Sequence, residues 1–121
     1  KAAFLSRWVW LNKTIFYIAV VLGCIIAFSP SEAGLQPQLN DKFLHIVGFF
    51  LISVLCHLAH PKVHKGLLLL GLAVLGLAIE MVQAYLPYRD FSLLDWAADI
   101  SGVFVYFCLL SKIVTDKFLL D

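Results

Sequence analysis

The sequence predicts an all-α integral membrane protein, a four-helix bundle with both termini in the cytoplasm. Of its 121 residues, 62% are hydrophobic and only 14% are charged. The apolar residues form four runs of roughly 17–21 residues, each long enough to cross about 30 Å of hydrocarbon. A soluble domain of this size has too much surface to cover with so few charges. The formal net charge of +1 gives no reason to expect nucleic-acid binding.

The first two predicted spans cover residues 8–29 and 41–59. Pro30 ends the first span because proline has no amide hydrogen for the helical ladder, and Pro61 stops the second span in the same way. The polar segment between the two spans makes a poor signal-peptidase site. We therefore expect the first span to stay in the protein as an anchor.

The last two predicted spans cover residues 66–86 and 93–111. Pro87 closes the third span. Ser92 is followed three residues later by Asp95, which is the pattern of a capping box at the start of a helix. The connecting loops are too short to separate domains, so the whole chain is predicted to form a single transmembrane domain.

Basic residues indicate how the bundle is oriented. The chain has nine Lys and Arg residues, and only Lys42 and Arg89 fall at the end opposite the termini. The positive-inside rule then places both termini in the cytoplasm and the loops at residues 30–40 and 87–92 outside. This predicts a multi-pass protein of the cell (inner) membrane.

Ionisable and amide side chains gather at the outer end of the last three spans. Each span contributes a pair at i,i+3 or i,i+4 spacing, which places both members on one helix face: Asp41 and His45, Glu80 and Gln83, and Asp95 and Asp99. An unpaired charge at this depth costs ~2.5–3.5 kcal/mol even on a lenient insertion scale. We therefore expect these side chains to face one another inside the bundle.

In their order along the chain, these motifs resemble the VanZ-like family of small membrane proteins. The resemblance covers roughly residues 40–106 and rests on Asp41-Lys42-Phe43-Leu44-His45, Glu80-x-x-Gln83, Arg89 and Asp95-x-x-x-Asp99-x-x-Gly102. It implies that the protein binds or modifies a lipid-linked or peptidoglycan-related ligand of the cell envelope, with a link to resistance to the antibiotic teicoplanin. The family's reaction is not settled, so whether the chain is an enzyme stays open.

Site roles follow from side-chain chemistry. We assign catalytic roles to His45, Glu80 and Asp99, since histidine titrates near neutral pH and carboxyls exchange protons with it. Lys42 and Arg89 suit a phosphate or carboxylate head group. The resemblance implies that three further family positions belong to the substrate-binding set: Asp41, Gln83 and Asp95. No cofactor is assigned. One imidazole and two carboxylates are enough for a divalent ion, but their spacing matches no known ligand motif, so no metal ligand is assigned.

The alternative hypothesis is a small accessory subunit of a larger membrane complex, in which the polar cluster only stabilises the bundle. Asp95 would then cap its helix, Lys42 would extend to the lipid head groups, and Arg89 would form a loop ion pair. Under either hypothesis the partners include membrane lipids. The histidines near the other end are expected to be solvated or interfacial: His57, His60 and His64.

Overall fold

The computed structural model describes the backbone of residues 2–29, 38–88 and 92–119, and the side chains of residues 7–29, 42–88 and 92–119. Every regular element within these residues is helical. Four helices are long and apolar enough to cross a membrane. The predicted all-α fold with four spans is therefore confirmed.

The first three spans are single helices, and the fourth span is a continuous series of four helical segments. The elements are α1 (Ala2–Phe28), α2 (Gln38–Ala59), α3 (Lys65–Tyr85), α4 (Leu93–Val105), η1 (Tyr106–Leu110), α5 (Ser111–Val114) and η2 (Thr115–Leu119), where η denotes a π-helical turn. The fourth span thus continues to Leu119 instead of ending near residue 111. The helix α1 begins at Ala2, and its candidate membrane span of Arg7–Phe28 agrees with the predicted span of residues 8–29.

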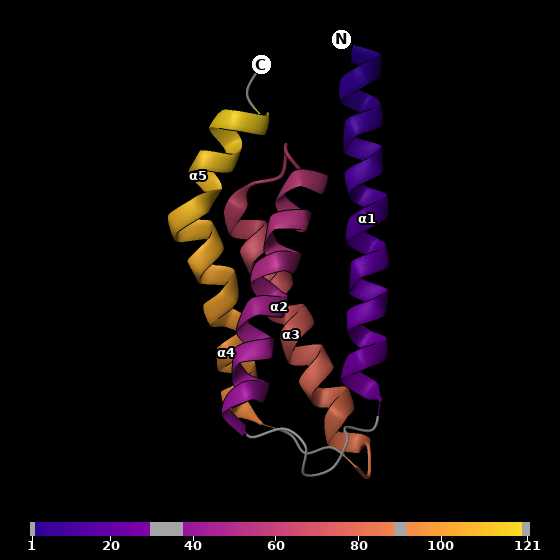
Figure 1. Cartoon of the computed structure of the whole chain (residues 1–121), viewed down its shortest axis with the longest axis vertical. Coiled ribbons are helices and arrows are strands. Elements are labelled where there is room, and N and C mark those ends of the chain that lie inside the picture. Colours follow the sequence, from indigo (N-terminus) through magenta and orange to yellow (C-terminus); the bar gives the residue numbers. More distant parts are fainter. Residues whose placement is uncertain (1, 30–37, 89–91, 120–121) are drawn as a thin grey trace.

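The four spans alternate in direction, so the start of α1 and the end of η2 lie at the same end of the molecule (Figure 1). The first turns of α2 and α4 and the last turns of α3 meet at the opposite end (Figure 1). The ends of the three helices that carry the predicted polar residues therefore lie on one side of the molecule.

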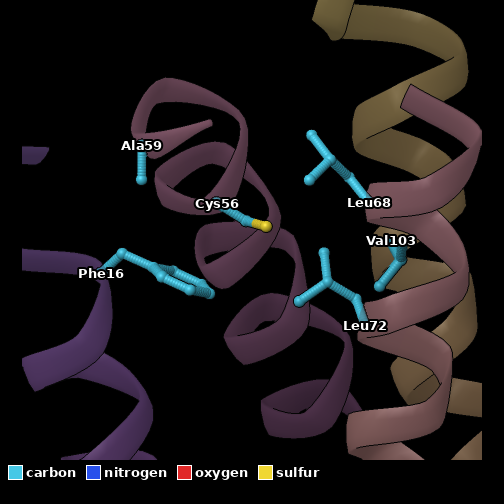
Figure 2. Close-up of a cluster of buried hydrophobic side chains, with 6 residues drawn as sticks. All are labelled: Phe16, Cys56, Ala59, Leu68, Leu72 and Val103. Atoms are coloured by element: carbon cyan, nitrogen blue, oxygen red, sulfur yellow. The ribbon is translucent and has the colours of Figure 1, made fainter. Parts of the chain in front are cut away.

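Helix α2 occupies a central position, since it packs most extensively on α4 and then on α1, while α3 packs mainly on α4. All four spans contribute to one apolar cluster, which Figure 2 shows: Phe16, Cys56, Ala59, Leu68, Leu72 and Val103. Lipid tails are as apolar as these side chains, so close van der Waals packing rather than a hydrophobic driving force holds the helices together.

Two glycines allow α4 to approach its neighbours closely. A Cβ atom added at Gly102 would lie 2.2 Å from the backbone oxygen of Ile46, so α2 and α4 touch backbone to backbone at this point. A Cβ atom added at Gly76 would lie 3.1 Å from Oδ2 of Asp99. Gly76 therefore leaves the room on α3 that the Asp99 carboxylate occupies. Small residues at helix contacts are typical of membrane bundles.

The turn between α3 and α4 follows the expected local chemistry. Leu86 has an extended backbone with φ −86° and ψ 132°, which is the conformation that a following proline favours. The side chain of Ser92 accepts a hydrogen bond from the backbone N–H of Asp95 at 3.2 Å. The predicted N-cap of the fourth span is therefore confirmed, and it fixes the rotation at which α4 enters the bundle.

Candidate functional site

Three predicted site residues meet inside the bundle: His45 from α2, Glu80 from α3 and Asp99 from α4. One ligand-type atom of each lies within 4.8 Å of those of the other two. At 1.5 Å per residue, their positions on the helices lie between about 7 and 11 Å from the nearest helix end. The meeting point is thus below the surface of the bundle.

The tightest contact within this cluster joins α2 to α4. Nδ1 of His45 donates a hydrogen bond to Oδ1 of Asp99 at 2.7 Å, and Asp99 is 1% exposed. Nε2 of His45 lies 3.9 Å from Oδ2 of Asp95. A carboxylate on one imidazole nitrogen fixes the orientation of the ring.

Glu80 is the most deeply buried member of the cluster, with 0% of its surface exposed. Within the described residues, neither carboxylate oxygen forms a hydrogen bond of normal geometry. The carboxylate interacts electrostatically with His45 and with the backbone N–H of Ser92. Buried polar atoms are satisfied in nearly all native structures, which makes this carboxylate a candidate for binding a ligand.

Lys42 and Asp95 form an ion pair beside the cluster, between α2 and α4. The Lys42 side chain is 30% exposed and the Asp95 side chain is 12% exposed, so the lysine lies closer to the outside. The Asp95 carboxylate therefore pairs with Lys42 in addition to standing in the first turn of α4. The pair places a cationic group beside the buried carboxylates, nearer to the outside of the bundle.

Gln83 lies one turn after Glu80, but its side chain contacts α1. Its Nε2 donates a hydrogen bond to the backbone oxygen of Ala27 at 2.7 Å, which ties α3 to the end of α1. The hydroxyl of Tyr88 donates to the backbone oxygen of Phe28 at 2.6 Å and reinforces this contact. Gln83 was predicted to bind substrate, and in the structure its amide holds α1 against the other helices.

Two predicted site residues cannot be placed in the same detail. The backbone of Asp41 lies in α2, one turn before His45, but its side chain is outside the described residues. Arg89 also lies outside the described residues. The described site therefore consists of His45, Glu80 and Asp99 with the Lys42–Asp95 pair beside them.

The chain was compared with known protein families, with solved structures and with curated proteins. No family model and no solved structure matches it. The uncharacterized protein C11E3.10 of Schizosaccharomyces pombe is 30% identical in an alignment of 96 residues that covers 76% of this chain and 59% of the relative. The chain thus spans 59% of the length of that yeast protein.

A second polar group was not expected from the sequence. His57 was predicted to be solvated or interfacial, but it is only 2% exposed. The hydroxyl of Tyr106 donates to Nδ1 of His57 at 2.7 Å, and Nε2 of His57 lies 3.5 Å from Oγ1 of Thr115. Both partners belong to the π-helical turns of the fourth span. The i,i+4 spacing of Ser53 and His57 was the available signal, because it puts both on one face of α2.

Proposed function

We propose that the protein binds a lipid-linked ligand with an anionic head group at the end of the bundle opposite its termini. In this proposal both termini are cytoplasmic, and the His45–Glu80–Asp99 cluster faces the extracytoplasmic leaflet. One observation carries it: ionisable side chains from three helices converge, two of them buried, within segments long and apolar enough to span a membrane. Such groups are expensive to place in a bilayer, and a functional role is the default explanation for them.

The partly exposed Lys42 beside the cluster supports an anionic head group for the ligand. Lys42 is paired with Asp95 yet remains partly exposed, so a phosphate can approach the ammonium group without first opening the bundle. Lysine binds phosphate as a point charge with three donors. A phosphate would share Lys42 with Asp95, and the buried carboxylates beyond it would contact the part of the ligand that follows the phosphate.

The depth of the cluster favours a lipid over a soluble polymer. The side chains lie within the membrane-spanning helices, where a lipid-linked group can arrive laterally from the bilayer. The resemblance of the Asp41–Gly102 motifs to VanZ-like proteins supports a ligand of the cell envelope. A link to teicoplanin resistance follows from the proposal only where that ligand is a lipid-linked peptidoglycan precursor.

Lipid retention by the purified protein tests the proposal. The protein in detergent is incubated with equal amounts of a polyprenyl phosphate, phosphatidylglycerol and phosphatidylcholine, and native mass spectrometry measures the lipid retained. We expect the phosphate-bearing lipids to be retained over phosphatidylcholine. We expect Lys42→Gln to weaken their retention about tenfold, which corresponds to a charge-assisted hydrogen bond, and Lys42→Arg to preserve it.

The matched control is Lys62→Gln, because Lys62 is exposed at the opposite end of the bundle. This variant should retain lipid as the wild type does. Equal retention of phosphatidylcholine, or unchanged retention in a folded Lys42→Gln protein, would overturn the proposal.

The second candidate is an accessory subunit in which the polar residues only hold the helices together. It is favoured by the fact that His45–Asp99 and Lys42–Asp95 both join α2 to α4. This candidate predicts that the protein purifies with fixed partner chains. It also predicts that substitutions of His45 and Glu80 leave the function of the complex intact once the protein is inserted. Loss of function in an inserted Glu80→Gln protein would exclude it.

A further inference from the structure

We propose that His45, Glu80 and Asp99 form a binding site for a divalent transition-metal ion. The spacing of these residues in the sequence matches no known ligand motif, and the inference rests on their arrangement in space. They offer one imidazole nitrogen and two carboxylate oxygens within 4.8 Å of one another. This mixed set is typical of zinc and manganese sites that keep a coordination position open.

The three ligand atoms lie within 4.8 Å of one another, so their side chains would have to adjust to share one metal ion. Ligand atoms around a tetrahedral ion at about 2.1 Å are separated by about 3.4 Å. Nδ1 of His45 and Oδ1 of Asp99 are 2.7 Å apart, so an ion would replace their hydrogen bond and separate them slightly. The glycine at position 76 faces the Asp99 carboxylate, and a larger residue there would restrict that movement.

Glu80 provides the independent observation. Its carboxylate is fully buried, lies with the other two ligands, and has no hydrogen bond of normal geometry within the described residues. A metal ion would supply a direct partner for its oxygens. It would also offset the repulsion between the Glu80 and Asp99 carboxylates, which share a small volume shielded from water.

The role of the ion deepens the proposed function and rests on it. An ion with three protein ligands keeps a position for an exogenous oxygen, and a lipid phosphate held by Lys42 is the ligand of the right charge. Metal and lysine together would then bind the head group from two sides. The metal site itself does not require that the ligand is a lipid.

Direct binding of Mn²⁺ and Zn²⁺ tests the inference. The purified full chain is stripped with EDTA and gel-filtered. Binding of Mn²⁺ is followed by loss of the free-ion electron paramagnetic resonance signal, and binding of Zn²⁺ by calorimetry. We expect about one ion per chain. Affinity should fall at least about tenfold in Glu80→Gln, Asp99→Asn and His45→Ala, whereas Asp116→Asn, an exposed carboxylate at the other end, should bind as the wild type does.

Two measurements on the wild-type protein keep the test valid even when the variants fail to fold. Nitrogen coupling to bound Mn²⁺ in pulsed spectra should reveal a histidine ligand, and the melting temperature should rise when metal is added. An absence of stoichiometric binding for both ions overturns the metal site, as does full affinity in a folded Glu80→Gln protein.

The two proposals fail separately. Retention of the polyprenyl phosphate in EDTA, with dependence on Lys42, would preserve the lipid proposal even when no metal binds. Metal binding in detergent without any phosphate lipid would preserve the metal site even when lipid retention shows no head-group preference.

Discussion

Oδ1 of Asp99 on α4 lies 2.7 Å from Nδ1 of His45 on α2, in a part of the bundle where Asp99 is almost fully buried. The contact connects the two helices that pack most extensively on each other. It therefore acts on stability and on the candidate site together, and substitutions at Asp99 should affect both.

Asp99→Ala should lower the free energy of unfolding by about 1–3 kcal/mol, because it leaves the largely enclosed imidazole of His45 without this acceptor. Asp99→Asn keeps an oxygen acceptor and should cost less. Unfolding in detergent, followed by circular dichroism, measures the difference. Asp116→Ala is the control because Asp116 is exposed. Equal losses in the Asn and Ala variants would show that the hydrogen bond contributes nothing.

Gly102→Ala should destabilise the bundle by about 1–3 kcal/mol, as overpacking does in a tight core. The added methyl group would lie 2.2 Å from the backbone oxygen of Ile46, and neither backbone can move aside cheaply. Gly71→Ala is the matched control, since nothing lies within 4 Å of its added Cβ and alanine favours the helix. Thermal unfolding of the two variants should differ in direction. A stable Gly102→Ala protein would contradict the close approach of α2 and α4.

The fold could be predicted from the sequence because apolar run lengths and prolines set the spans, and the bilayer leaves few alternatives to helices. Much of the site could also be predicted, because exposing the ionisable side chains of His45, Glu80 and Asp99 to lipid is energetically unfavourable and they are expected to face the bundle interior. The burial of His57 and the contact of Gln83 with α1 were not predicted. Both depend on how each helix is rotated against its neighbours, which apolar residues on every face do not reveal.

Gln83→Leu should loosen α1 without affecting the metal site. Leucine fills a similar volume but cannot donate to the backbone oxygen of Ala27, so we expect a loss of about 0.5–1.5 kcal/mol. Thermal unfolding measures this loss, and Mn²⁺ titration of the same preparation measures the site. If the variant keeps its stability but binds metal more weakly, Gln83 contributes to the site, as the sequence predicted, and not to the packing of α1.

Tyr106→Phe should destabilise the protein by about 1 kcal/mol, because the ring stays packed while Nδ1 of His57 loses its donor. Chemical unfolding in detergent provides the measurement. Tyr85→Phe is the matched control, since Tyr85 is 87% exposed and should tolerate the change. Equal stability of the two variants would mean that the buried pair adds nothing to the packing of the rings.

The proposed orientation predicts which loops an impermeant thiol reagent reaches on intact cells. Gln36 lies between α1 and α2 in the sequence, outside the described residues, and Gln36→Cys should be labelled directly. Lys62→Cys lies in the loop between α2 and α3, where basic residues are concentrated, and should be labelled only after the membrane is opened. The background is a chain in which alanine replaces the native cysteines, all within predicted spans: Cys24, Cys56 and Cys108. The reverse pattern would put the His45–Glu80–Asp99 cluster on the cytoplasmic side and remove the extracytoplasmic ligand from consideration.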